Sequence, residues 1–195
     1  MCPRFPPTIA GMTLVRDTFC SFCGVKYENA AAYPRTCAGC KTQVWANPIP
    51  VSVVLLPVTR SGRTGLLTVR RGIQPGLGKL ALVGGFLEEH ETWQQGGARE
   101  LVEETGAKVE PSTLSPFWFV STEPRPNRVL LFSIASPVDA ANVAPFTPNH
   151  ETQERGLVYG PKGLSDVFAF PLHVRAAEKY FASVGNTSDH GFEAI

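Results

Sequence analysis

The stretch from Gly84 to Ala107, GGFLEEHETWQQGGARELVEETGA, decides the fold of this chain of 195 residues. On a helix of about 3.6 residues per turn, Glu100, Glu103 and Glu104 fall within an arc of roughly 100°, and apolar residues around Leu101 cover the opposite side. Carboxylates at this spacing repel one another in water by roughly 0.2–0.5 kcal/mol per pair. Because oxygen ligands so arranged suit Mg²⁺ or Mn²⁺, the spacing predicts a divalent cation site on one helix face.

A solvated acidic helix surface is the alternative interpretation of these carboxylates. Solvated surfaces usually mix charge signs, but the segment from Glu88 to Glu104 holds six acids and one arginine, Arg99. Gly96 and Gly97 also lie within the expected helix, where each costs about 1 kcal/mol relative to alanine. Either a close approach of another backbone segment or side-chain packing explains these glycines. Because the charges of this segment are almost all of one sign, we favour the cation site over the solvated surface.

The overall composition excludes several classes of partner. With 18 basic and 17 acidic residues the formal net charge is +1, so no global field attracts nucleic acid or an anionic membrane. No apolar run approaches the roughly 20 residues of a membrane helix, and residues 1–11 lack the apolar core of a signal peptide. We expect a cytoplasmic protein. Residues 1–17 are expected to form a flexible tail with Cys2 as a free thiol and Met12 as an alternative start.

Two Cys-x-x-Cys pairs, separated by thirteen residues, follow this tail. The four cysteines are Cys20, Cys23, Cys37 and Cys40. This spacing is typical of a four-cysteine zinc ribbon, which we place at residues 18–46. Two disulfides or a redox pair are the alternatives, and a reducing compartment disfavours disulfides. Four thiolates leave no open position for water, so the zinc is expected to be structural and to stabilise a unit too small for a core of its own.

The rest of the chain alternates predicted strands with two helices over residues 47–184. A glycine, Gly106, is expected to end the acidic helix, and residues 185–195 are expected to form a flexible tail. Strands before and after an acidic helix, followed by a second helix, predict an α/β domain with a mixed sheet between helical layers. The predicted strands are Val51–Val58, Gly65–Arg70, Leu80–Val83, Pro116–Ser121, Arg128–Ala135 and Glu154–Tyr159, and the second helix is Leu172–Val184.

The acidic stretch also resembles a known family signature. Read from Gly85, its fixed positions are Gly85, Glu91, Arg99, Glu100, Leu101, Glu103, Glu104, Gly106 and Ala107. This string resembles the signature of the Nudix (MutT-like) hydrolases at every fixed position. The resemblance covers residues 50–184 and implies a Nudix α/β/α sandwich with a mixed β-sheet. It also implies cleavage of a nucleoside diphosphate derivative, by attack of water on a pyrophosphate phosphorus with the help of a divalent metal.

The resemblance assigns roles to individual residues. Glu91 and Arg99 are implied to form an orienting ion pair. The implied metal ligands are three carboxylates and one backbone carbonyl, namely Glu100, Glu103 and Glu104, with Gly84 or Gly85. Such roles agree with the chemistry, because divalent ions neutralise a strongly anionic diphosphate and lower the pKa of bound water.

The general base is left open by the sequence. In this family it varies between the signature itself and a late loop. Glu103 is the candidate within the signature, and the late loop supplies Glu151, which we rank ahead of Glu154. The neighbouring His150 is interpreted as a surface histidine.

A zinc ribbon ahead of this signature is similar to the ribbon-bearing NADH and FAD pyrophosphatases. We therefore expect a small-molecule nucleotide substrate, a dinucleotide such as FAD or NADH. Trp118 is a candidate for stacking on a base or flavin, and Arg125 and Arg128 are candidates for phosphate contacts. Core packing of the tryptophan and solvation of the arginines are the alternatives.

The alternative functions are hydrolysis of ADP-ribose, removal of an RNA cap, and a non-catalytic module that senses nucleotides and binds a partner through its ribbon. Loss of catalysis normally shows as loss of Glu103, Glu104 or Arg99, and this chain has all three. The ribbon carries three basic residues between 18 and 46, which is few for phosphate contacts. The ribbon is expected to brace the fold or a homodimer interface.

Overall fold

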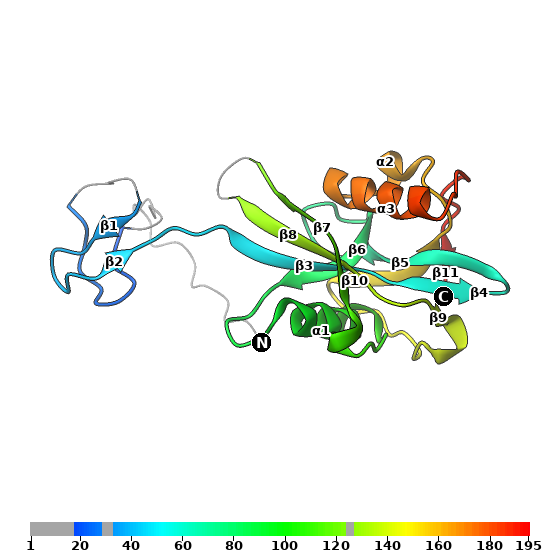
Figure 1. The fold of residues 1–195 in the computed structure, drawn as a ribbon, viewed down its shortest axis with the longest axis horizontal. Helices are drawn as coiled ribbons and strands as arrows, with labels where there is room; N and C mark the ends of the chain where they lie inside the picture. The colour runs from blue at the N-terminus through cyan, green and yellow to red at the C-terminus, as the bar shows by residue number, and fades with distance from the viewer. Residues whose placement is uncertain (1–17, 29–32, 124–126) are drawn as a thin grey trace. The chain divides into compact units, whose positions relative to one another are not determined.

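The computed structural model describes residues 18–28, 33–123 and 127–195. The chain divides into two compact units, residues 1–47 and residues 48–195 (Figure 1), next to the boundary expected at residue 46. Three features predicted from the sequence lie outside the described residues: the tail at 1–17, its Cys2, and the candidate phosphate ligand Arg125.

The first unit is a short hairpin flanked by two similar turns. Strands β1 (Arg35–Thr36) and β2 (Gln43–Val44) pair antiparallel. In each turn a backbone N–H four residues later donates to a cysteine carbonyl, from Gly24 to Cys20 over 2.9 Å and from Lys41 to Cys37 over 3.0 Å. Both donors have a positive φ, 73° and 64°. The turns therefore have the same form although one uses glycine and the other lysine.

The second unit is a mixed sheet of nine strands in the described part of the chain. The order along the sheet is β11-β10-β5-β6-β3-β8-β7, with β4 on β5 and β9 on β4. β3 and β8 run parallel, whereas the pairs β3–β6, β5–β6 and β7–β8 are antiparallel. The strands are β3 (Ile49–Leu55), β4 (Pro57–Arg60), β5 (Arg63–Arg71), β6 (Leu80–Phe86), β7 (Ser115–Ser121), β8 (Arg128–Ile134), β9 (Val138–Asp139), β10 (Thr152–Val158) and β11 (Glu193–Ala194).

Helices cover both faces of this sheet. Helix α1 (Trp93–Thr105) lies on one face, and α2 (Leu164–Val167) and α3 (Pro171–Ser183) lie on the other (Figure 1). Successive residues of β3 serve the two layers, because Val53 belongs to the core beneath α3 and Val54 to the core beneath α1. Two short 3-10 turns, η1 (Pro111–Thr113) and η2 (Ala140–Asn142), follow α1 and β9. The predicted α/β/α sandwich with a mixed sheet is confirmed.

Two expectations about this unit are wrong. The strand expected at Val51–Val58 is two strands, β3 and β4, which meet at Leu56 and pair with different neighbours. The segment 185–195, expected to be a flexible tail, instead contains β11, which pairs antiparallel with β10 at the sheet edge. Its docking depends on Gly156, because a side chain there would collide with the ring of Phe192. Among the described residues, none of the helices has the length and apolar character needed to cross a membrane.

Candidate active site and cysteine cluster

The acidic helix has well-defined ends. Thr92 caps its start, where the Gln95 N–H donates to Thr92 Oγ1 over 3.2 Å and the Thr92 N–H donates to Gln95 Oε1 over 2.8 Å. This reciprocal arrangement satisfies two N–H groups that the first turn cannot pair internally. At the other end Gly106 adopts the left-handed conformation, with φ 73°. Local sequence therefore fixes the phase of the helix, and with it the positions of the glutamates.

Tight packing explains the two glycines within the helix. A Cβ at Gly97 would lie 2.9 Å from both Ser52 Oγ and a methyl of Val54 on β3, and a Cβ at Gly96 would collide with Leu87. Ser52 in turn donates from Oγ to the Trp93 carbonyl over 2.9 Å. Glycine thus lets α1 approach β3 closely. This approach places the acidic face of the helix at the end of β6, where Gly84 and Gly85 lie.

The glutamates of α1 line a pocket of about 280 Å³. Glu104 accepts a hydrogen bond from the Gly84 N–H at 3.1 Å. The Glu100 carboxylate lies against Gly85, where a Cβ would collide with it. The lining consists of Glu100, Glu103, Glu104, Asn149, His150 and Glu151. The structure thus brings the predicted metal ligands and the first-ranked late-loop carboxylate to one site.

Arg99 connects the predicted ion pair to two of the predicted metal ligands. Its Nη2 and Nε donate to the two carboxylate oxygens of Glu91 over 2.8 and 3.1 Å, and these bonds hold the pKa of Glu91 below its usual value. Its Nη1 donates to Glu100 over 2.8 Å and to Glu103 over 3.1 Å. A fifth hydrogen bond runs from Nη2 to the carbonyl of Phe86, over 3.0 Å. Arg99 therefore orients two candidate ligands as well as its ion-pair partner.

The two inner carboxylates, Glu100 and Glu104, are buried enough to lose much of their hydration. Burial raises the pKa of Glu104 to about 8 against the opposing hydrogen bond from Gly84, and burial also raises the pKa of Glu100. Both groups hold protons more tightly than usual because their charged forms lose hydration. A site of oxygen donors that favours neutralisation suits a hard divalent cation. Glu103, with a side chain 58% exposed, completes the oxygen donors on the solvent side.

The two base candidates outside the signature, Glu151 and Glu154, have different surroundings in the structure. Glu151 lines the pocket, and its Oε1 lies 3.3 Å from Nε2 of His150, whose side chain is 83% exposed. Glu154 instead forms an ion pair with Arg70 at 2.6 Å, across the β5–β10 pair. The position of Glu151 therefore fits the chemistry better than that of Glu154. The choice between Glu151 and Glu103 stays a prediction.

The two candidate substrate contacts in the described part of the chain, Trp118 and Arg128, are not among the residues that line the pocket. Trp118 stacks on Phe132 with ring centroids 5.3 Å apart, and Arg175 and Lys179 of α3 lie over its ring. This ring packs against the core beneath α3, on the sheet face opposite α1. The guanidinium carbon of Arg128 lies 5.6 Å from the ring centre of Phe86. Phe86 is the residue directly after the paired glycines Gly84 and Gly85. Core packing accounts for Trp118, whereas Arg128 stays a candidate for substrate contact.

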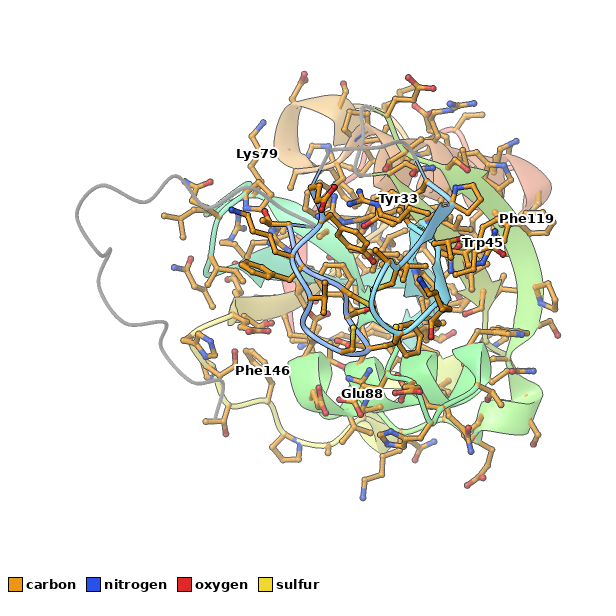
Figure 2. All side chains as sticks on the ribbon, turned by 90° about the vertical axis from the view of Figure 1, so that its left-hand side faces the viewer. Tyr33, Trp45, Lys79, Glu88, Phe119 and Phe146 are labelled. Atoms are coloured by element: carbon orange, nitrogen blue, oxygen red, sulfur yellow. The ribbon has the colours of Figure 1, made fainter. Side chains whose placement is uncertain are left out.

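Two further residues at or near the site carry weaker sequence signals, and an exposed aromatic residue lies on the outer strand β7. Asn149 lines the pocket. Arg71 pairs with Thr152 across the sheet, and its positive charge lowers the pKa of Glu104 against the effect of burial. Phe119, labelled in Figure 2, is 71% exposed on the outer strand β7. The pair of adjacent arginines after a strand was the available signal for Arg71, and no spacing rule identifies Asn149.

The four cysteines of the first unit form a compact cluster. Their sulfur atoms all lie within 4.8 Å of one another, with Cys20 to Cys40 at 3.8 Å and Cys23 to Cys37 at 3.6 Å. Four thiolates around zinc at Zn–S distances of about 2.3 Å have sulfur separations of about 3.8 Å. Hydrogen bonds from the backbone of Phe22 and Cys23 lower the pKa of Cys20 to about 6. The geometry of the cluster therefore fits a zinc ribbon.

Comparison with known proteins identifies the family. The sequence model of the NUDIX domain matches residues 48–159. This match spans more than half of the chain, so the protein belongs to the NUDIX family, and the predicted Nudix hydrolase class is confirmed.

Solved structures share the fold. A NUDIX hydrolase from Nitrosomonas europaea superposes with a TM-score of 0.61 and 23% identity, over 89% of this chain and 96% of that one. An Ap4A hydrolase from C. elegans has a TM-score of 0.56 and 13% identity, over 70% and 98%. The NUDIX domain of Shewanella oneidensis NrtR, solved with ADP ribose, has a TM-score of 0.55 and 20% identity, over 71% and 89%. At these identities the likeness concerns the fold alone.

Proposed function

We propose that this protein is a Mg²⁺- or Mn²⁺-dependent hydrolase that cleaves the diphosphate bond of a nucleoside diphosphate derivative, with a dinucleotide such as FAD or NADH as its substrate. The observation that supports the proposal is the pocket in which Glu100, Glu103 and Glu104 of α1 meet Glu151 of the late loop. A sensor that had lost catalysis would have no need to retain this full set of carboxylates.

The residues of the pocket have distinct proposed roles. Glu100, Glu103 and Glu104 would hold the cation, which when bound neutralises phosphate charge and lowers the pKa of a coordinated water. Arg99 orients Glu100 and Glu103 through its 2.8 and 3.1 Å hydrogen bonds. The Gly84 N–H fixes the Glu104 carboxylate from the opposite side.

Glu151 is the proposed general base. Its side chain is 51% exposed and faces the same pocket, whereas the Glu103 carboxylate is already hydrogen-bonded to Arg99. A carboxylate that Arg99 does not engage is better able to accept a proton. In the proposed reaction, the water oxygen bonds to one phosphorus, its proton passes to Glu151, and the bond from that phosphorus to the bridging oxygen breaks. The products are two monophosphates.

A second candidate substrate is ADP-ribose. The NUDIX domain of NrtR was solved with ADP ribose, and ADP-ribose contains the same diphosphate linkage as FAD and NADH. In this proposal the carboxylate pocket acts on the shared diphosphate linkage. The sugar or flavin beyond it would bind to residues outside the pocket.

We also propose that zinc occupies the four-cysteine cluster in a structural role. The buried core of this unit consists of Cys20, Cys37 and Val44, with Tyr27 and Tyr33 against it. Such a core is too small to stabilise the hairpin alone, and bound zinc supplies the missing free energy. Reduced thiols in this cluster agree with the expected cytoplasmic location.

Product analysis tests the proposed reaction. The purified full chain is incubated with FAD, NADH, ADP-ribose and a nucleoside triphosphate, each with Mg²⁺ or Mn²⁺. We expect cleavage of a diphosphate-linked substrate to monophosphates by the wild type and by Glu178→Gln, which alters an exposed carboxylate on α3. We expect a loss of about 10³-fold or more in Glu104→Gln, because several kcal/mol of charge stabilisation disappear. No turnover of any substrate, with Mn²⁺ demonstrably bound, would favour the nucleotide-sensing alternative.

A further inference from the structure

We propose that Asn149 is a positioning residue whose side chain fixes the turn that presents Glu151 to the carboxylates of α1. This inference rests on the proposed function, because it assigns Asn149 a task in the same pocket. It extends that function by naming what sets the position of the proposed base.

The side chain of Asn149 closes the turn that contains Glu151. Its Oδ1 accepts hydrogen bonds from the N–H groups of both Glu151 and Thr152, each at 2.8 Å. The Asn149 N–H donates to the Thr152 carbonyl over 2.9 Å. One oxygen thus holds two successive N–H groups, and the main chain closes the same turn in the other direction. An asparagine side chain is well suited to this role because it mimics a backbone carbonyl.

The same turn is attached to the sheet and to the catalytic helix. The Gly72 N–H, at the end of β5, donates to the Glu151 carbonyl over 2.6 Å. A Cβ at Gly72 would collide with the backbone of His150, so the two segments lie in direct contact. On the other side, Asn149 Nδ2 reaches the carbonyl of Glu103 at 3.5 Å. Asn149 therefore links the turn to the helix that carries the predicted metal ligands.

The position of the Glu151 carboxylate depends on this backbone. Glu151 is half exposed, and its contact with the exposed His150 is a weak constraint. By contrast, Glu104 and Glu100 are fixed through Gly84 and Arg99. The carboxylate of Glu151 is held at the pocket by its main chain, and four of the hydrogen bonds described above involve Asn149. Loss of the Asn149 side chain would release the turn without changing the charge of the pocket.

A double-mutant cycle in the full chain tests this inference. We expect Asn149→Ala to lower kcat by about 10- to 100-fold, the scale of effect caused by misplacing a reacting group by about 1 Å. Glu151 contributes a negative charge to the pocket without being a proposed ligand, so Glu151→Gln and displacement of this carboxylate in Asn149→Ala should both lower Mn²⁺ affinity, measured by titration calorimetry. Because Asn149 acts through Glu151, the double variant should be no worse than Glu151→Gln alone in either measurement. Multiplicative losses in the double variant would overturn the inference.

Two further variants separate positioning from a general structural effect. Asn149→Ser keeps an oxygen that can accept in a similar turn, and we expect it to recover part of the lost kcat and Mn²⁺ affinity. Asn142→Ala alters an exposed asparagine at the other end of the same connection, and we expect wild-type behaviour. Equal losses in the alanine and serine variants of Asn149 would contradict the role of Oδ1.

The outcomes also distinguish this inference from the proposed function. If Glu104→Gln is inactive but Glu151→Gln matches the wild type in kcat and Mn²⁺ affinity, the hydrolase stands and the role of Asn149 is overturned. If the wild type hydrolyses none of the substrates, the double-mutant cycle can still be read from Mn²⁺ affinity alone. The affinities of the wild type, Asn149→Ala, Glu151→Gln and the double variant then decide whether Asn149 acts through Glu151.

Discussion

The cysteine cluster and the carboxylate pocket are both groups of four acidic side chains, but they are built in different ways. All four cysteines come from two turns of the same form, and their sulfur atoms meet within 4.8 Å without help from distant segments. The carboxylates come from α1 and the late loop, which the β5–β10 pair and the packing of α1 on β3 bring together. One site is encoded by local spacing, whereas the other depends on the whole sheet.

The two sites also treat charge differently. Backbone N–H groups lower the pKa of Cys20, and a hydrogen bond from Thr42 lowers that of Cys40. Burial has the opposite effect on Glu100 and Glu104, whose pKa values rise. Within the cysteine site the effects are mixed, because burial raises the pKa of Cys23 to about 11 against a hydrogen bond from the backbone of Val25. Two of the four cysteines thus ionise more easily than usual, whereas both inner carboxylates hold protons that a bound cation would have to displace.

The largest predicted effect follows from the local construction of the cysteine site. Replacing Cys37, the fully buried member of the cluster, by serine should prevent the proposed zinc binding and unfold residues 18–47, because structural zinc contributes about 10–16 kcal/mol to small ribbons. Hydrogen exchange followed by mass spectrometry should show rapid exchange in that unit and unchanged protection of β3, β5 and β6. Cys2→Ser is the matched control. Retained protection of β1 and β2 in the Cys37 variant would show that zinc is not what stabilises the unit.

The next effect concerns the distant connections that assemble the carboxylate pocket. Arg155, on β10 and 5% exposed, donates from Nη1 to the carbonyls of Thr105 and Ala144 over 2.6 and 2.8 Å. It thereby ties the end of α1 to the late connection. Arg155→Leu leaves two carbonyls without this donor and should lower the free energy of unfolding by about 3 kcal/mol.

Urea unfolding monitored by circular dichroism measures this change. The control Arg175→Leu alters an exposed arginine of α3 and should change stability by less than about 1 kcal/mol. Similar values for the two variants would mean that the contacts of Arg155 do not hold the unit together.

The smallest effect is the pH dependence of metal binding. The folded-state pKa of Glu104, about 8, lies above its ordinary value of 4.5. Between these values the folded, metal-free protein retains a proton that the unfolded chain has lost, so its stability falls as pH rises through this window. A cation must displace that proton. Mn²⁺ affinity should therefore rise by up to about tenfold per pH unit from pH 6 to 8 and level off above.

Calorimetry in buffers of different ionisation enthalpy would count the protons released on binding. Glu104→Gln should bind Mn²⁺ more weakly, and most of the pH dependence should disappear. Equal affinity of the wild type at pH 6 and pH 8 would show that Glu104 is already ionised without metal, and the contrast with the cysteine site would fail.

Sequence spacing predicted the features that are encoded locally. The acidic helix, its end at Gly106 and the cysteine pairs each depend on residues within about one or two turns of one another. The same local reasoning ranked Glu151 above Glu154, but the reason became visible only in the sheet. The register of β5 and β10 places Glu154 opposite Arg70, with which it forms an ion pair, whereas Glu151 lines the pocket.

What the sequence did not reveal depends on contacts between distant residues. Asn149 belongs to a turn whose importance arises from Gly72 and Glu103, which precede it by many residues. The docking of β11 depends on the fit of Phe192 over Gly156. Trp118 was one of three consecutive aromatic residues, and its partner Phe132 on the neighbouring strand decided which face it packs on.

The most direct test of the central claim is hydrolysis in H₂¹⁸O. The wild type is incubated with Mn²⁺ and FAD, NADH or ADP-ribose, and the products are analysed by mass spectrometry beside Glu104→Gln. The account predicts two monophosphates from at least one substrate, with one ¹⁸O in one of the two phosphates and no detectable product from the variant. Intact substrates with Mn²⁺ bound, or equal cleavage by Glu104→Gln, would contradict the claim that this pocket is a diphosphate hydrolase.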